Sequence, residues 1–221
     1  RSARPDVRFQ SRVADEVGAR RYWVAEHHNM PAVAATNAPL LMSLIAAATS
    51  HVRVGSGGVM LPNHAPLVVA EQVALLEAAY PGRGDVGIGR APGSDPVTSH
   101  LLRGGASGDG VDTFDDDVAA LAALVHPEGV EVRVGSTSYP LRATPRATSA
   151  PQLWLLGSSM YSAHLAAAKG LPYVFAHHFS GQGTAEALEV YRSEFRPGTP
   201  ASEPVTFFTV NAVVSYTPDE A

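Results

Sequence analysis

Short apolar stretches that end abruptly in polar or glycine residues recur along this chain, and amphipathic stretches separate them. The clearest example covers residues 21–28, where an apolar run passes directly into Glu26, His27 and His28. Aromatic and β-branched residues between turn-forming sequences favour a buried strand. A buried strand with a carboxylate and two imidazoles at its C-terminal end is typical of a parallel α/β barrel, which builds its active site there.

The alternation predicts about six strands interleaved with helices. The expected strands cover 21–26, 52–61, 85–90, 152–156, 172–177 and 205–216; the expected helices cover 1–18, 37–50, 66–80, 114–125, 160–170 and 185–195; and 131–134 with 139–142 is expected to form an inserted β-hairpin. Open doubly wound sheets and closed barrels both show this alternation. The barrel is favoured because polar or glycine residues follow successive strands. They are His27, His28, Gly57, Gly58, Arg90, Ser158, Ser159, His177 and His178.

Composition narrows the class of protein. The 221 residues correspond to one domain, and 45% apolar residues with a net charge of −5 are typical of a globular protein without a cationic face for nucleic acid. The chain has no cysteine, which excludes disulfides and thiolate chemistry. Its apolar runs fall short of the ~20 residues of a membrane span, and no signal peptide precedes the first expected helix. We therefore expect a cytoplasmic protein with no nucleic-acid or membrane partner.

The stretch Glu26-His27-His28 has three interpretations: a metal site, a general acid/base, or a structural hydrogen-bonding group. Neighbouring residues on a strand point to opposite faces, so at most one of the two histidines is expected to enter the mouth of a barrel. Without a second ligand cluster at suitable spacing, we expect no metal, and we favour acid/base use or polar anchoring of a ligand.

Other strand ends suggest a site for a phosphate and a flat ring. Arg90 offers a planar donor fork, and Ser158 and Ser159 precede a helix whose N-terminus favours anions. A salt bridge at Arg90 and ordinary helix capping at the serines are the structural alternatives. The pair Gly57-Gly58 either relieves crowding or forms a strained or cis peptide beneath a ring. The role of His177 and His178 stays open.

Several motifs, in order along nearly the whole chain, resemble the bacterial luciferase-like flavin monooxygenases. They are Val24-Ala25-Glu26-His27-His28, Gly55-Ser56-Gly57-Gly58-Val59-Met60-Leu61-Pro62, Pro81-Gly82-Arg83, Gly87-Ile88-Gly89-Arg90, Gly157-Ser158-Ser159 and Gly170-Leu171-Pro172. The resemblance implies a TIM (β/α)8 barrel, here a single domain over 1–221 that lacks the first strand and the last strand–helix units. Light-emitting members carry a cysteine where this chain has Gly89, so bioluminescence is not expected.

The resemblance also assigns roles to individual residues. His27, with Glu26 beside it, matches the catalytic histidine near the flavin and its peroxide, and Gly57-Gly58 matches a non-proline cis peptide that supports the isoalloxazine. Arg90 and Ser159 match phosphate contacts, with Ser158 and Met160 as their neighbours in the cofactor site; Ser158 falls where the family varies. Residues 103–112, which are rich in glycine, are a candidate lid.

The function implied by this resemblance is oxidation of a small organic substrate by reduced FMN and O2 through a flavin C4a-peroxide. Natural-product tailoring is one setting that the resemblance implies for such a reaction. The partners implied are a flavin reductase, which supplies the reduced FMN, and a second copy of the chain in a homodimer formed through 37–50 and 66–80. Two alternatives remain open: a hydride-transfer oxidoreductase that uses the deazaflavin F420, and a flavin-binding protein without catalysis.

Overall fold

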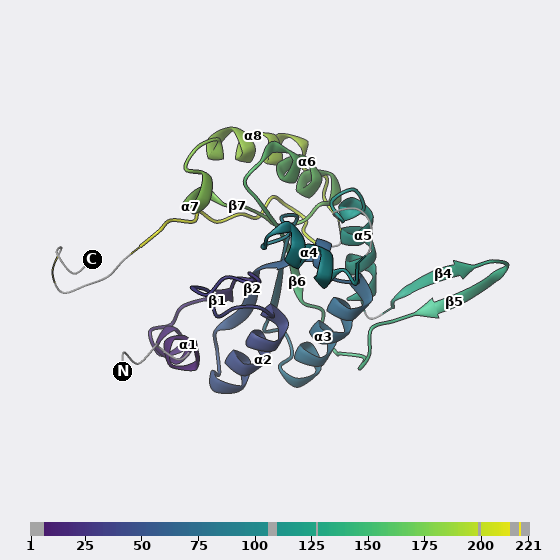
Figure 1. The fold of residues 1–221 in the computed structure, drawn as a ribbon, viewed down its shortest axis with the longest axis horizontal. Coiled ribbons are helices and arrows are strands. Elements are labelled where there is room, and N and C mark those ends of the chain that lie inside the picture. The colour runs from purple at the N-terminus through teal and green to yellow at the C-terminus, as the bar shows by residue number, and fades with distance from the viewer. Residues whose placement is uncertain (1–6, 106–109, 127, 199, 213–216, 218–221) are drawn as a thin grey trace. The chain divides into compact units, whose positions relative to one another are not determined.

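Parallel strands followed by helices make up most of the chain in a computed structural model, which describes residues 7–105, 110–126, 128–198, 200–212 and 217 (Figure 1). The strands are β1 (Arg21–Val24), β2 (Arg53–Met60), β3 (Gly84–Gly89), β4 (Val130–Val134), β5 (Thr137–Leu141), β6 (Gln152–Gly157) and β7 (Tyr173–Phe175). The helices are α1 (Val7–Glu16), α2 (Ala38–Ala48), α3 (Pro66–Ala79), α4 (Pro96–Leu102), α5 (Phe114–Leu124), α6 (Met160–Lys169), α7 (His177–Ser180) and α8 (Thr184–Glu194), with a 3-10 turn η1 (Leu61–Asn63).

The chain divides into two compact units, residues 1–154 and 155–221. In the first unit the strand order is β1-β2-β3-β6, and β1 pairs with β2, and β2 with β3, in parallel. In the second unit the end of β6 pairs in parallel with β7. All six residues of β3 are buried, as expected for a strand covered on both faces. The predicted α/β class with a parallel sheet is therefore confirmed.

Local sequence explains where several elements begin and end. The side chain of Asn37 accepts a hydrogen bond from the Leu40 N–H at 2.9 Å and caps α2, as predicted. α6 ends at Gly170, whose φ of 62° is the left-handed conformation that glycine adopts most readily. The predicted hairpin forms from β4 and β5, which pair antiparallel and project from the helices of the first unit (Figure 1).

Three expectations about elements were wrong. The strand predicted over 172–177 ends at Phe175, and His177 begins the short helix α7. Residues 205–212 of the predicted strand 205–216 form no strand: one backbone bond, from Tyr173 N–H to Val205 O at 3.0 Å, joins them to β7. Side-chain hydrogen bonds, such as the one from Thr209 Oγ1 to Phe175 O, take the place of the further backbone hydrogen bonds that a strand would form. Residues 213–216 lie outside the described residues.

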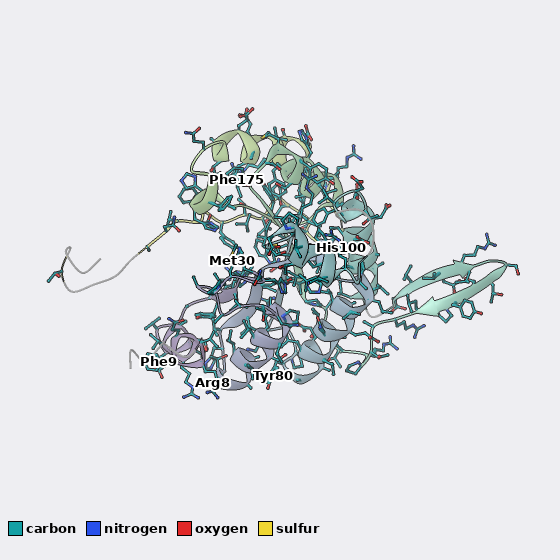
Figure 2. All side chains as sticks on the ribbon, in the orientation of Figure 1. Arg8, Phe9, Met30, Tyr80, His100 and Phe175 are labelled. Carbon is teal, nitrogen blue, oxygen red and sulfur yellow. The ribbon has the colours of Figure 1, made fainter. Side chains whose placement is uncertain are left out.

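The third concerns the apolar faces that helical spacing predicts for the first two helices. They are Phe9, Val13 and Val17 for α1, and Leu40, Leu41, Leu44, Ile45 and Ala48 for α2. Phe9 (Figure 2), Val13 and Val17 are 64%, 42% and 75% exposed, and the buried residue of α1 is Ser11. In α2, Leu40 and Leu44 are exposed. The buried residues of α2 are Ala38, Pro39, Met42, Ile45 and Ala46. Periodicity identified both helices correctly, but the buried residues lie on a neighbouring face, which packs on α2 in the case of α1 and on β1 and β2 in the case of α2. Within the described residues, no helix is long and apolar enough to cross a membrane.

Candidate functional site

A buried carboxylate, that of Glu26, lies just beyond the end of β1. Its side chain is 0% exposed. Oε1 is 2.8 Å from Nε2 of His28 and 2.7 Å from Nε2 of His64, and Oε2 accepts the Met60 N–H at 3.2 Å. The end of β1 supplies Glu26 and His28, and the residue after η1 supplies His64. Three donors thus satisfy one buried carboxylate.

Opposing effects set the pKa of Glu26. Burial is the largest of them and raises the pKa. The hydrogen bond and charge interaction of His64, the hydrogen bond of His28 and the Met60 N–H lower it, and together they leave the pKa below its ordinary value. Glu26 is therefore ionised at neutral pH. Because an ionised carboxylate only accepts hydrogen bonds, Nε2 of His28 and Nε2 of His64 each carry a hydrogen.

The same three residues could supply ligands to a metal ion, since their ligand atoms lie within 4.8 Å of one another. The separations from Oε1 to the two Nε2 atoms, 2.7 and 2.8 Å, are hydrogen-bond lengths. Ligand atoms around a tetrahedral zinc with bonds of ~2.0 to 2.1 Å lie ~3.3 Å apart. The arrangement is that of a hydrogen-bonded cluster, and the absence of a metal stays a prediction.

His27 does not join this cluster. Its backbone N–H donates to Ala35 O at 2.8 Å. Within the described residues its buried Nδ1 has no hydrogen-bond partner. Unpaired buried polar atoms are rare in folded proteins, and they mark positions where a ligand or water completes the bonding. The two neighbouring histidines therefore separate as alternation along an extended chain predicts: His28 bonds to Glu26, and His27 does not.

The loops after β1, β2 and β3 meet around Glu26. The His28 N–H donates to Gly93 O at 3.0 Å, and Asn63 Nδ2 donates to Pro92 O at 2.7 Å. Gly93 has a φ of +63°, and a Cβ there would lie 2.9 Å from Glu26 O. This loop therefore needs glycine at position 93 to approach the end of β1.

The peptide bond between Gly57 and Gly58 is cis, as predicted. The pair lies near the end of β2, where the register of pairing with β3 shifts between Gly57 and Val59. Gly57 is exposed, and a Cβ on it would stand 3.4 Å from the ring of Trp23. The backbone of β2 is thus exposed at Gly57, where a flat ligand could approach it.

The predicted phosphate residues lie in different units. Arg90 follows the last residue of β3 in the first unit and is half-buried. Ser158, Ser159 and Met160 follow β6 in the second unit, where both serines are exposed. Ser159 is the N-cap of α6, but its side chain makes no capping hydrogen bond. Ordinary capping therefore does not account for the Ser159 hydroxyl, and its contact with a phosphate stays a prediction.

Sequence reasoning missed His64. The available signal was its position: His64 follows the strand predicted over 52–61 much as His28 follows the preceding one. The ends of neighbouring parallel strands lie at the same edge of a sheet, so these two side chains were candidates for contact. The intervening turn η1, which brings His64 back to Glu26, has no comparable signal in the sequence.

Comparison with known proteins decides the family. The profile of the family described as "Luciferase-like monooxygenase" matches residues 3–221. This chain belongs to the luciferase-like monooxygenase family. A curated Escherichia coli K12 member, also described as a luciferase-like monooxygenase, is 44% identical over 205 residues, which are 93% of this chain and 59% of that protein. The crystal structure of apo-MsnO8 superposes with a TM-score of 0.83 at 39% identity and covers 91% of this chain and 58% of that one.

Two other relatives in the luciferase-like family have names that state their chemistry. The N-acetyl-S-alkylcysteine monooxygenase of Bacillus subtilis is 34% identical over 96% of this chain and 62% of its own length. The oxygenase component of the flavin-dependent trigonelline monooxygenase of Acinetobacter baylyi is 37% identical over 78 residues, 35% of this chain and 22% of that protein. The chain spans less than two thirds of these relatives, and its fold is part of the TIM barrel of this family.

Proposed function

We propose that this chain forms the flavin-binding part of a monooxygenase that oxidises a small organic substrate with reduced FMN and O2. The observation that carries the proposal is the buried Nδ1 of His27, unpaired within the described residues, which follows the end of β1; the neighbouring strand β2 carries the cis peptide Gly57-Gly58. Family membership supports the class of reaction, and the flavin-dependent relative supports the class of cofactor.

The residues present fit a flavin. The exposed Gly57 of the cis peptide would support a flat ring. Arg90 in the first unit and, taken separately, Ser159 with Ser158 and Met160 in the second unit are the candidate phosphate contacts. When bound, reduced flavin would supply the two electrons that activate O2. His27 would donate or accept a hydrogen bond at Nδ1 close to the reacting oxygen, and the largely buried Glu26 cluster would keep water away from it.

The source of reduced flavin is a separate protein in this proposal. The Acinetobacter relative is named as the oxygenase component of its system, which supports a two-component arrangement with a flavin reductase as partner. We also propose that residues 1–221 are part of a single barrel domain, and that the protein works as a homodimer.

An anaerobic titration tests the proposal. The purified protein is titrated with reduced FMN and, in parallel, with reduced F420, and binding is followed by absorbance and protein fluorescence. We expect saturable binding of reduced FMN. Binding of reduced F420 alone would replace the proposal with hydride transfer, and binding of neither would remove the flavin site.

A pair of variants separates catalysis from binding. His27→Asn removes the ring but keeps a short polar side chain, so we expect retained FMN binding and loss of oxygen-dependent turnover. His51→Asn is the control, because the His51 ring is 87% exposed in the turn before β2. If His27→Asn turns over as fast as the control, His27 has no catalytic role.

A further inference from the structure

A recess of about 350 Å³ opens at the end of β7, in the second unit. Phe175, the last residue of β7, is labelled in Figure 2. The short helix α7, which begins with His177 and His178, lines one side, and Val210 and Asn211 line the other. The proposed flavin contacts use none of these residues.

Two hydrogen bonds of the Thr209 hydroxyl favour one nitrogen of the His178 ring as the one that carries hydrogen. The Thr209 hydroxyl donates its hydrogen to Phe175 O at 3.2 Å. Nδ1 of His178 is 3.0 Å from the same hydroxyl oxygen, which can then only accept. This arrangement places the hydrogen on Nδ1 of His178 and leaves Nε2 of the neutral ring with a lone pair. Within the described residues, Nε2 has no hydrogen-bond partner.

Two other polar groups of the recess each use one hydrogen internally. The Ser180 hydroxyl donates to Gln182 O at 3.1 Å, and Asn211 Nδ2 donates to His178 O at 2.9 Å. The lone pairs of the Ser180 oxygen and of His178 Nε2 remain for a ligand. The recess thus offers an acceptor at His178 Nε2, which complements a group that donates a hydrogen bond, while Asn211 Nδ2 keeps its second hydrogen.

The position and walls of the recess suit a substrate. The Ala176 N–H donates to Gly157 O at 2.9 Å, so the ends of β7 and β6 lie side by side, and β6 leads directly to Ser158. Phe179 and Val210 in the recess are 83% and 62% exposed and supply apolar contact area. Barrel enzymes place substrates at this edge of the sheet.

We propose that the recess at the end of β7 binds a hydroxyl or amine group of the substrate, with Nε2 of His178 as the acceptor of its hydrogen bond. That the bound molecule is the one oxidised rests on the proposed function; binding itself does not. The ligand class is a small molecule that combines an apolar body with one hydrogen-bond donor.

The arrangement of hydrogens is tested by NMR of protein labelled with 15N-histidine. Long-range 1H–15N correlations distinguish a nitrogen that carries hydrogen from one with a lone pair. We expect His178 to be Nδ1–H with unprotonated Nε2, and we expect Thr209→Val, which removes the Oγ1 acceptor, to abolish this preference. A His178 ring with hydrogen on Nε2 in the unsubstituted protein would overturn the inference.

Binding is tested with benzyl alcohol and benzyl methyl ether, which differ by the donor hydrogen. We expect benzyl alcohol to shift the His178 Nε2 resonance saturably and to bind about fivefold to tenfold more tightly than the ether, as one hydrogen bond of ~1 kcal/mol implies. His178→Asn places an amide N–H where Nδ1 was, so it can keep the Thr209 contact while lacking Nε2. We expect this variant to lose the preference for the alcohol.

The control variant is His164→Asn on α6, where the His164 ring is 51% exposed and 2.6 Å from Glu194; we expect it to keep the preference for the alcohol. Equal binding of alcohol and ether to the unsubstituted protein, or an unchanged preference in a folded His178→Asn variant, would overturn the inference. Neither readout requires flavin. Failure to bind reduced FMN with preserved alcohol binding would therefore reject the proposed function and keep this site.

Discussion

The carboxylate of Glu26 determines where two neighbouring imidazoles hold their hydrogens. One oxygen accepts from both Nε2 atoms and the other from Met60 N–H. The amide of Glu26→Gln has one acceptor atom and one donor atom, so a donor would face a donor in either orientation. We expect a loss of about 1 to 3 kcal/mol in the free energy of unfolding, measured with urea. Glu194→Gln, at the half-exposed His164 pair, is the control, and equal losses would contradict this reading of Glu26.

Asp15 links α1 to the turn before β2, and this link depends on pH. Its carboxylate accepts the N–H groups of Ser50, His51 and Val52. The Ser50 N–H lowers the pKa of Asp15 most and burial opposes it, but the Val52 and His51 N–H groups and the charge of the His51 ring bring the pKa from 3.8 to about 2.

A lowered pKa in the folded state stabilises the protein above the unfolded value. We therefore expect the contribution of Asp15 to be complete above pH 3.8 and to disappear as the pH falls to about 2. Urea unfolding at several pH values between 5 and 2 should show a shallower decrease for Asp15→Asn than for the unsubstituted protein. Parallel curves would show that Asp15 is not a source of acid lability.

At the scale of elements, one buried carboxylate joins the beginnings of β1, β2 and β3. Asp85 accepts hydrogen bonds from Arg21 Nε at 2.9 Å, Arg53 Nη2 at 2.6 Å and Trp23 Nε1 at 3.1 Å. Asp85→Asn would leave the two guanidinium groups without their shared charge partner. We expect a loss of about 3 kcal/mol, visible as a lower Tm. Asp116→Asn on the exposed face of α5 is the control.

Most elements were predictable because their signals are local or periodic. Three such signals depend only on residues close in the sequence. Asn37 caps α2, Gly170 ends α6, and Gly57-Gly58 forms the cis peptide. α4 was missed because Val97 and Leu101 are exposed and form no buried stripe, although Asp95 caps it through the N–H groups of Val97 and Thr98.

Contacts between distant residues were beyond sequence reasoning. The fold brings His64 to Glu26 across 38 positions, and neither residue indicates the other. The stretch 205–212 has the aromatic and β-branched residues of a strand. Side-chain bonds of Thr209 and Asn211 to the end of β7 and to α7 decide its conformation, and such bonds leave no periodic signal.

For the whole molecule, the apolar residues left exposed on α2 and α3 bear on assembly. Leu40 and Leu44 on α2 are 61% and 46% exposed, and Val68 and Leu75 on α3 are 49% and 58% exposed. Apolar side chains grouped on neighbouring helices favour a protein partner. We expect a dimer in light scattering coupled to gel filtration, and a monomer for Leu44→Glu combined with Leu75→Glu. A dimer that survives both changes would place the interface elsewhere.

In the proposed function, this chain presents reduced flavin to O2 close to His27. The most direct measurement is rapid mixing of the complex with reduced FMN, prepared without oxygen, with oxygenated buffer, while absorbance is recorded. We predict an oxygen-dependent transient that free reduced FMN does not give and that His27→Asn shortens or abolishes. Reoxidation at the rate of free reduced FMN, unchanged by His27→Asn, would contradict the claim.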